Sequence, residues 1–372
     1  MKIVICGDTC FTKANIKQAV SGNAKWIFGD TLPIIRDSDY SICNLESPAT
    51  DACTARPKSG PNIKMDQKSI RGLAEAGFNA VSLANNHILD YGEAGVKDTI
   101  QECEFFGMET FGAGCNSEAS KKPCFYCSGT ISAGFYSVAD NECSIASNDS
   151  YGANGYNPYS TLNDIRSASN NCNLLVVLYH SGLEHYQYPS PGLQVRCRAM
   201  IDSGAKVVLC QHSHCIGTYE VYQGGLILYG QGNFLFSKNN KDEKWNTGIL
   251  VELNIMEDSF SWVLHPSHIS DGQVELLDYK QASIVLEEIE KRRIEISNPE
   301  LLVAKWSEFN SRRASIYWGI LSRWTKIHFG LDRLANGALS RFAMRSNKTM
   351  IIENIVRCES HRESLLWVLS HK

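Results

Sequence analysis

The sequence predicts an α/β fold followed by a helical C-terminal extension, and three observations predict it. Five short apolar runs of strand length each end in polar residues, and segments with helical periodicity lie between these runs. Strands that alternate with helices favour layered sheets, with ligand sites beyond the carboxyl ends of the strands. From about residue 281 onward the pattern is helical.

Each of the five predicted strands ends in side chains of the kind that bind ligands. The strands span residues 2–6, 40–43, 80–84, 174–179 and 207–210. The residues directly after them are Gly7-Asp8, Asn44-Leu45-Glu46, Asn85-Asn86-His87, His180 and Gln211-His212-Ser213-His214. In extended backbone, side chains at i and i+2 share a face, so we expect His212 and His214 to project in the same direction.

The segments between and after these strands complete the predicted fold. Helices are predicted over 66–76, capped by Asp66 and stopped by Gly77, over 95–106, stopped by Gly107, and over 194–201. Residues 140–173 are rich in Asn, Ser and Gly, which predicts a long loop beside the site. Alternating patterns over 226–236 and 247–255 predict antiparallel strands that close a second sheet.

Composition excludes some classes of partner and sets an expected location. The chain of 372 residues has a net charge of −4, which does not suggest a protein that binds nucleic acid. Its first residues lack the apolar core of a signal peptide, and no stretch approaches the roughly 18 apolar residues of a spanning helix. We therefore expect a cytoplasmic protein with reduced thiols among its 14 cysteines.

The polar residues at the strand ends form a candidate ligand set for metal ions. It comprises Asp8, Glu46, Asn86, His87, His180, His212 and His214. Mixed carboxylate, amide and imidazole ligands suit Mn, Fe or Zn, and their number favours two ions about 3.5–4 Å apart that share a bridging carboxylate. Each residue also has a structural interpretation: Asp8 and Asn85-Asn86 as turn residues, Asp90 as a helix cap, and His87 as a buried polar side chain.

Six motifs in order resemble those of a known family. They are Gly7-Asp8, Asn44-Leu45-Glu46, Ala84-Asn85-Asn86-His87 with Asp90-Tyr91-Gly92, His180-Ser181-Gly182-Leu183-Glu184, His212-Ser213-His214 with Glu220, and Tyr229-Gly230-Gln231-Gly232-Asn233-Phe234. The sequence thereby resembles, over about residues 1–255, the bacterial CapA family of capsule and poly-γ-glutamate synthesis, within the calcineurin-like metallophosphoesterase superfamily. The resemblance implies a four-layer αββα two-sheet sandwich over residues 1–280 and a separate helical extension over 281–372.

The resemblance also implies a role for each ligand. Asp8 and His214 would bind the first metal, Glu46 would bridge the two, and Asn86, His180 and His212 would bind the second. His87 would face the substrate and protonate the leaving oxygen or stabilise charge on the phosphoryl group. A hydroxide activated by the two metals would attack in line, so the resemblance implies a phosphoesterase that would act on a phosphorylated or anionic polymer-related substrate.

One position departs from the superfamily pattern. Where the first motif has Asp-x-His, this chain has Asp8-Thr9-Cys10. Cys10 is either a thiolate ligand or a buried thiol with no role in binding, and a weak first site would slow hydrolysis. The alternative function is therefore a metal-binding accessory factor for assembly or transport of a capsule polymer. Further family positions are Asn85, Asp90, Glu184, Glu220 and Asn233, near the metals, and Lys64, near the substrate, with structural roles also open.

The extension carries a basic aromatic segment. Residues 281–372 hold 15 Lys and Arg against 10 Asp and Glu, and residues 305–348 hold nine against two. Within the latter, Ile316, Ile320, Trp324, Ile327, Leu331 and Leu334 recur at helical spacing, near Trp306, Tyr317, Trp318 and Phe329. This pattern predicts either a helix packed on the domain or one that contacts an anionic membrane surface or a membrane-protein partner.

Overall fold

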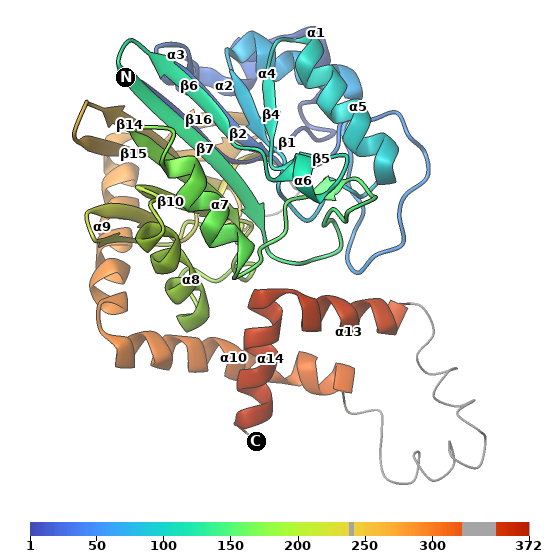
Figure 1. Cartoon of the computed structure of the whole chain (residues 1–372), viewed down its shortest axis with the longest axis vertical. Coiled ribbons are helices and arrows are strands. Elements are labelled where there is room, and N and C mark those ends of the chain that lie inside the picture. The colour runs from blue at the N-terminus through green and yellow to red at the C-terminus, as the bar shows by residue number, and fades with distance from the viewer. Residues whose placement is uncertain (238–241, 322–346, 372) are drawn as a thin grey trace.

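Two β-sheets pack face to face and carry helices on their outer faces (Figure 1). The computed structural model describes residues 1–237, 242–321 and 347–371. The strand order is β16-β15-β14-β1-β2-β3-β4 in the first sheet, where β13 also pairs with β1, and β11-β12-β10-β9-β7-β6 in the second. This arrangement confirms the predicted four-layer sandwich with a helical C-terminal extension.

The centre of each sheet is parallel, so its strands end at one edge. In the first sheet these strands are β1 (Lys2–Cys10), β2 (Tyr40–Leu45), β3 (Ala80–Ser82) and β4 (Glu109–Phe111), with β13 (Asn233–Phe236) parallel to β1. In the second they are β7 (Ile131–Ala139), β9 (Leu174–His180), β10 (Val207–Gln211) and β12 (Gly225–Leu228).

Antiparallel strands flank both parallel centres. They are β14 (Thr247–Ile255), β15 (Phe260–Ser270) and β16 (Gln273–Leu276) in the first sheet, and β6 (Cys124–Ser128) and β11 (Tyr219–Tyr222) in the second. A separate pair joins β5 (Ala113–Gly114) to β8 (Gly152–Ala153).

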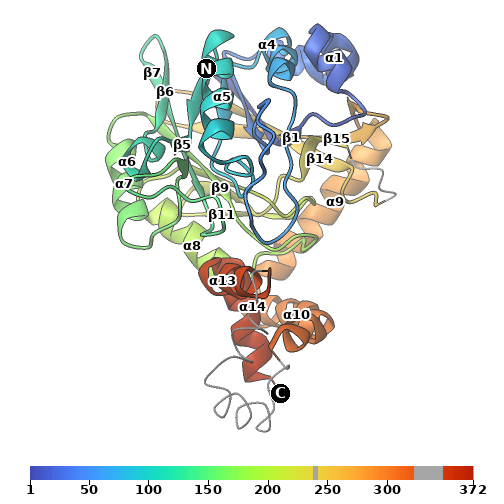
Figure 2. The ribbon, with the colours of Figure 1, turned by 90° about the vertical axis from the view of Figure 1, so that its right-hand side faces the viewer.

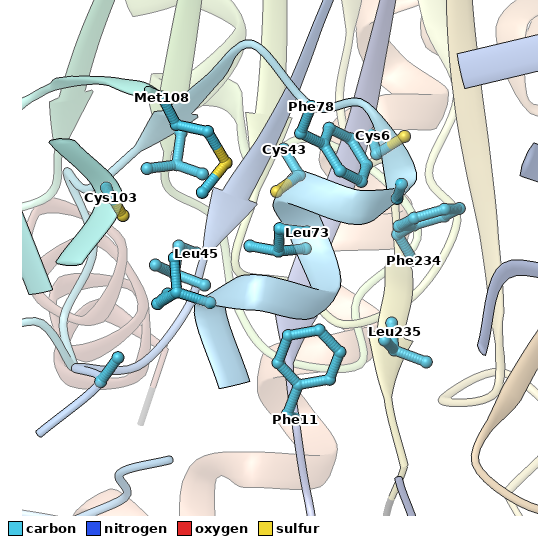
Figure 3. Packing of buried hydrophobic residues seen from close by; sticks show 14 of the residues in the cluster. Cys6, Phe11, Cys43, Leu45, Leu73, Phe78, Cys103, Met108, Phe234 and Leu235 are labelled. Atoms are coloured by element: carbon cyan, nitrogen blue, oxygen red, sulfur yellow. The ribbon is translucent and has the colours of Figure 1, made fainter. Parts of the chain in front are cut away.

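Alternation along the strands builds three apolar layers. Ile3 and Ile5 of β1 point between the sheets toward residues such as Val176 of β9, whereas Val4 points to the outer face. That outer face is covered by α1 (Ile16–Ser21), α2 (Ala24–Phe28), α3 (Leu32–Arg36), α4 (Ile70–Ala76) and α5 (Gly92–Phe105), where side chains such as Leu73 and Phe78 pack (Figure 3). Helices α7 (Ser160–Ser169) and α8 (Pro191–Asp202) cover the second sheet.

The predicted helices form, with differences at their ends. The Asp66 side chain accepts a hydrogen bond from the Lys68 backbone N–H ahead of α4, and Gly77 ends α4 with φ of 98°. Helix α5 starts three residues before the predicted start at residue 95, and α8 starts at Pro191, a residue type favoured at the first helical position. A short helix α6 (Ser117–Ser120) was not predicted.

Two predictions on the second half of the domain are wrong. Residues 140–173 are not all loop, because α7 buries Thr161, Ile165 and Ala168 at helical spacing that the polar composition obscured. The strands over 226–236 and 247–255 do not close the second sheet together. Only β12 joins it, parallel to β10, and the chain then crosses to the first sheet through Gly230 and Gly232, which have φ of 153° and 72°.

The C-terminal extension is helical where the structure describes it. It comprises α9 (Tyr279–Ile296), α10 (Pro299–Leu321), α13 (Asn347–Arg357) and α14 (Glu359–Ser370), which lie along and beneath the sandwich (Figure 2). Trp306 packs against Leu183 and Tyr186, and Tyr317 packs with α13 and α14.

Two predictions about the extension stay open. The described side chains do not include Trp318, Ile320, Trp324, Ile327, Phe329, Leu331 and Leu334, so most of the predicted apolar stripe lies outside them. In the ranges that the structure describes, no helix is both long enough and apolar enough to cross a membrane. The division of the chain into two domains at residue 280 stays a prediction.

Candidate metal centre

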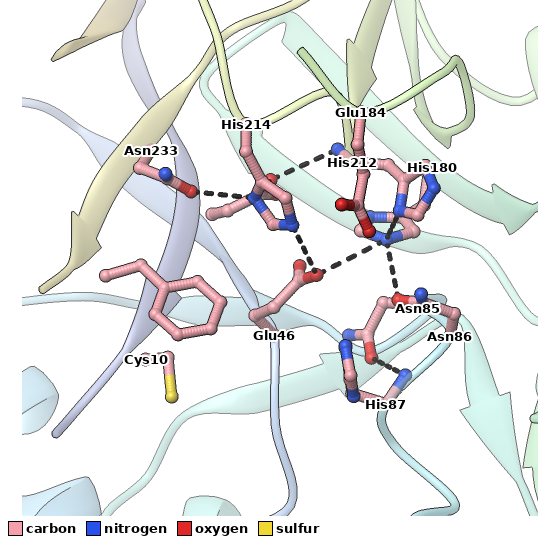
Figure 4. Close-up of polar contacts among 12 residues, drawn as sticks. Cys10, Glu46, Asn85, Asn86, His87, His180, Glu184, His212, His214 and Asn233 are labelled. Atoms are coloured by element: carbon pink, nitrogen blue, oxygen red, sulfur yellow. Dashed lines mark hydrogen bonds and ion pairs between the residues drawn. The ribbon is translucent and has the colours of Figure 1, made fainter. Parts of the chain in front are cut away.

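The ends of five strands deliver their polar side chains to one place (Figure 4). Asp8 lies in β1, Glu46 directly follows β2, and Asn86 follows β3. His180 is the last residue of β9, and His212 and His214 follow β10. Of these six, all but Asn86 are buried, with at most 4% exposure. The structure therefore brings all six predicted metal ligands together.

Four ligand atoms converge around the ring of His180. Its Nε2 lies 3.2 Å from Asn86 Oδ1, 3.5 Å from Glu46 Oε1 and 3.2 Å from His212 Nδ1. Two imidazole nitrogens this close can bind one ion together when neither carries a proton. The geometry of this first ligand group suits a divalent ion held by nitrogen and oxygen.

A second ligand group shares Glu46 with the first group. It contains Asp8 and His214, the residues predicted to bind the first metal. His214 Nδ1 lies 3.3 Å from Asp8 Oδ2, and His214 Nε2 lies 4.0 Å from Glu46 Oε1. Asn44 holds the two carboxylates in place, because its Nδ2 donates to Asp8 Oδ1 at 2.8 Å and to Glu46 Oε2 at 2.7 Å. The free oxygen of Glu46 therefore faces both groups, as a bridging ligand must.

Glu46 Oε1 supplies the test of whether metal ions fit this site. Glu46 is fully buried, and among the described residues none donates a hydrogen bond to its Oε1. An unpaired buried carboxylate oxygen carries a desolvation penalty, and a cation between the two ligand groups would compensate for it. The residues present fit divalent metal binding, and Glu46 Oε1 faces both ligand groups.

Burial and neighbouring charges set the protonation of these ligands. Burial raises the pKa of Glu46 well above its usual value, and the charge of Asp8 raises it further. Burial also acts to raise the pKa of Asp8, but the hydrogen bonds from His214 and Asn44 and the nearby imidazoles outweigh it, so the net shift is downward. Burial lowers the pKa of His180, which keeps its ring neutral as metal binding requires.

The two histidines after β10 reach the site by a different backbone from the one predicted. The strand ends at Gln211, and His212 and His214 have φ of 87° and 51°, in the left-handed region rather than the extended one. The expectation of an extended i, i+2 pair is therefore wrong, although both rings face the site. The backbone N–H of His212 donates to Asp8 Oδ2 at 3.1 Å, which helps to hold this unfavourable conformation.

His87 lies beside the ligand groups and is held by two charged residues. Its Nδ1 is 2.7 Å from Asp90 Oδ2 and 3.1 Å from Lys58 Nζ, and Lys58 forms an ion pair with Asp90. Burial lowers the pKa of His87, and the Lys58 charge lowers it further. Asn85 has a supporting role, since its Oδ1 accepts from the His87 N–H and its Nδ2 donates to the Leu45 carbonyl.

Asn233 and Cys10 lie next to the second ligand group. Asn233 Oδ1 is 2.9 Å from His214 Nδ1 and its Nδ2 donates to the Trp245 carbonyl, so the amide orients the ring. Cys10 is 3% exposed and packs with Phe236 and Trp245, and its Sγ lies 3.2 Å from Ser47 Oγ. Cys10 is not among the ligand atoms that converge.

Three further predicted residues have contacts with residues outside the ligand groups. Glu184 is exposed, with Oε2 4.0 Å from His185 Nε2, and its charge raises the pKa of Glu46. Glu220 forms an ion pair with Arg198 and accepts from the Tyr229 hydroxyl at 2.7 Å. Lys64 donates to the Ala52 carbonyl at 2.6 Å on the surface, so the structure gives it a local contact outside the site.

The candidate set predicted from the sequence omitted three residues that contact the site. Asn44 lies in β2, two positions before Glu46, which directly follows the strand. This spacing places both side chains on one face, so the sequence could have indicated that Asn44 contacts the site. Lys58 and Glu142 lie in loops without periodicity, and Glu142 Oε1 is 3.4 Å from His212 Nε2. Both also line a pocket of about 160 Å³ whose far wall includes Asn354 and Arg357 of α13.

Fold and site together define a class: α/β sandwich proteins with a candidate metal centre at the adjoining ends of two sheets. Residues 2–238 match the family described as "Bacterial capsule synthesis protein PGA_cap". The chain belongs to this family, which confirms the resemblance seen in the sequence motifs.

Individual relatives carry names that agree with this family. The chain is 31% identical over 248 residues to "Capsule biosynthesis protein CapA" of Bacillus anthracis, covering 64% of this chain and 60% of the relative. It is 30% identical over 237 residues to "PGA biosynthesis protein CapA" of Bacillus subtilis (strain 168), covering 62% of each. This chain thus spans less than two thirds of the length of these relatives.

A solved structure of a hypothetical protein from Thermus thermophilus is similar with a TM-score of 0.48 and 16% identity. The similarity covers 74% of this chain and 99% of that one. Assignment to the family rests on the match over residues 2–238 and on the curated relatives.

Proposed function

We propose that this protein is a metal-dependent phosphoesterase that acts in the synthesis of a capsule or polyglutamate-like polymer at the bacterial cell surface. One observation carries the proposal: the unpaired, buried Oε1 of Glu46 lies between two groups of ligand atoms. A site of this kind suits two ions bound side by side, and such pairs catalyse phosphoryl transfer to water.

Bound divalent ions, of Mn, Fe or Zn, would supply Lewis acidity and lower the pKa of a bound water. The residues of the chain do the rest. His180 and His212 bind through nitrogen, and Asn44 fixes the carboxylates of Asp8 and Glu46. His87, with Nδ1 held by Asp90 and Lys58, turns its other nitrogen to the substrate, where it donates a proton to the leaving oxygen or stabilises phosphoryl charge.

The names of the relatives and the charges near the site support an anionic substrate related to a polymer. The pocket beside the site is lined by Arg56, Lys58 and Arg357, together with Glu142 and Glu353. The three cations suit phosphate or carboxylate groups on the substrate.

Metal analysis combined with hydrolysis assays tests the proposal. We expect the purified chain to bind two equivalents of divalent metal and to hydrolyse members of a panel of phosphomonoesters and phosphodiesters. His212→Ala and His180→Ala should each reduce metal content and hydrolysis together, because each removes a nitrogen from one ligand group. Glu220→Gln, which alters an ion pair outside the site, is the matched control. If both histidine variants retain full metal content and activity, the proposal is wrong.

Cys10 favours a second candidate function. Its thiol contacts Ser47 where the superfamily has a histidine, which leaves Asp8, Glu46 and His214 as the ligand residues of the second group. A metal-binding accessory factor that assembles or transports a polymer without hydrolysis fits this reduced set. Two bound metals with no turnover of phosphomonoesters, phosphodiesters or polyglutamate would favour it. Cys10→His should then strengthen metal binding and create or raise hydrolysis.

The basic segment 305–348 supports a proposed contact with a membrane surface or a membrane-protein partner from the cytoplasmic side. Trp306 and Tyr317 are buried in the extension and are not available for such a contact. Co-sedimentation of the full chain with vesicles of anionic lipid tests the membrane contact. Pelleting that is lost at high salt supports it, and no pelleting at low salt excludes it.

A further inference from the structure

The turn between α13 and α14 packs against a short loop segment, residues 140–143, that follows β7. Ser360 Oγ donates to Asp140 Oδ2 at 2.7 Å. The backbone N–H and the side-chain amide of Asn141 both donate to the Glu359 carboxylate at 2.9 Å. The Cys143 thiol contacts Asn354 Oδ1 at 3.6 Å. Each neighbour of Glu142 along the chain is thus held by the C-terminal helices.

These contacts are buried, so they hold the segment firmly. Ser360 is 2% exposed and Glu359 is 8% exposed. Asp140 is 3% exposed and also accepts from the Tyr179 hydroxyl at 2.6 Å, next to His180 in the chain. Buried hydrogen bonds to a carboxylate are among the stronger ones, because little water competes for the partners.

Glu142 itself points at a candidate metal ligand. Its Oε1 lies 3.4 Å from His212 Nε2, with side-chain exposures of 10% for Glu142 and 4% for His212. The other nitrogen of the ring, Nδ1, faces His180 Nε2 at 3.2 Å inside the ligand group. A carboxylate beside Nε2 of His212 keeps the ring proton on Nε2, so Nδ1 presents a lone pair to a metal.

We propose that α13 and α14 are part of the metal centre, because they hold Glu142 where its carboxylate orients His212. Glu142 is a positioning residue, and Ser360 and Glu359 act through it. The inference rests on the proposed metal centre but not on hydrolysis. It extends the site to residues beyond the segment 2–238 that matches the family.

A second contact supports this role for α14. The backbone N–H of Gly182 donates to Ser360 Oγ at 3.3 Å, and Gly182 lies two residues after His180. The hydroxyl of Ser360 therefore joins the loop after β9 to the loop after β7. The first loop directly follows His180, and the second carries Glu142, the partner of His212. His180 and His212 are the two nitrogen ligands of one group.

Titration of the whole 372-residue chain, freed of metal, with Mn²⁺, followed by calorimetry and by electron paramagnetic resonance, tests the proposal. Glu142→Ala should weaken binding of one of the two ions by about 10–100-fold, the usual effect of removing such an outer carboxylate. Glu142→Gln retains an oxygen acceptor for the His212 ring and should restore most of the affinity. Glu363→Gln is the matched control, since Glu363 lies on α14 but contacts Ser190 and Gly192 instead.

A double-mutant comparison separates positioning from general damage to the fold. Ser360→Ala should weaken the same ion, yet add little in the Glu142→Ala background, because both changes act through one contact. Thermal unfolding of each variant reports any loss of fold independently. Wild-type affinity in Glu142→Ala, or fully independent effects of the two changes, would overturn the proposal and leave the metal centre intact. A wild-type chain that binds no Mn²⁺ would overturn both.

Discussion

Replacing Glu46 with Gln should stabilise the metal-free protein and remove its stabilisation by metal. Glu46 is fully buried, its Oε1 has no hydrogen-bond donor among the described residues, and burial and Asp8 raise its pKa. An acid whose pKa is raised in the folded state lowers stability at every pH above its unfolded pKa. Gln keeps an oxygen for the Asn44 amide and carries no charge, so we expect a gain of about 1–3 kcal/mol.

Thermal unfolding with and without metal measures both effects. For the wild type, Mn²⁺ at a hundred times its dissociation constant should add about 2.7 kcal/mol, which corresponds to a few degrees in Tm. The Glu46→Gln variant should start from a higher Tm after treatment with a chelator. It should then show almost no increase when Mn²⁺ is added, because the shared ligand of both groups is lost.

Glu220→Gln is the matched control for this experiment. It makes the same chemical change at a carboxylate that pairs with Arg198 outside the site, so it should lower Tm slightly and retain the full metal effect. A Glu46→Gln variant that unfolds at a lower temperature than the metal-free wild type would refute the expected gain. A variant that retains the wild-type increase with Mn²⁺ would refute the bridging role of Glu46.

Three more outcomes are expected from the described contacts. His87→Asn should reduce hydrolysis by about 10²–10⁴-fold while metal content by elemental analysis stays unchanged, because His87 lies outside both ligand groups; a parallel loss of metal contradicts this role. Burial lowers the pKa of His180 in the folded chain, whereas the unfolded residue titrates near 6.5. As the pH drops below about 6.5, the free energy of unfolding of the metal-free chain, measured in urea, should therefore decrease by up to ~1.4 kcal/mol per pH unit. A free energy of unfolding that stays constant between about pH 5 and 6.5 contradicts this expectation. Trp306→Ala should lower the free energy of unfolding, measured with denaturant, by about 3–5 kcal/mol, since Trp306 is 3% exposed and packs on Leu183 and Tyr186. A decrease of less than about 1 kcal/mol would show that this contact contributes little to stability.

Strand ends were predictable because apolar runs followed by polar residues leave a clear local signal. Glu46 and His180 were placed correctly at such ends, since parallel strands that share an edge bring the residues at their carboxyl ends together. Asp8 reaches the same edge from within β1, which runs four residues past the predicted end at Cys6. The backbone of His212 and His214 was not predictable, because left-handed φ values depend on contacts such as the hydrogen bond from His212 to Asp8.

Contacts that depend on distant segments left no signal in the sequence. Glu142 faces His212 across 70 positions of chain, and the helix that holds it begins more than 200 positions later. Lys58 lies in a loop, and its partners His87 and Asp90 are brought to it only by the folded strands and turns. Lys64, included by resemblance, donates to the Ala52 carbonyl on the surface, and its place near the substrate stays a prediction.

The two ligand groups each combine residues from both sheets. Asp8, Glu46 and Asn86 come from the first sheet, whereas the three histidines come from the second. Bound ions would therefore crosslink the two halves of the sandwich at one end. Amide hydrogen exchange in β2, β9 and β10 should slow near that end when metal binds, while the opposite ends of the same strands exchange as before.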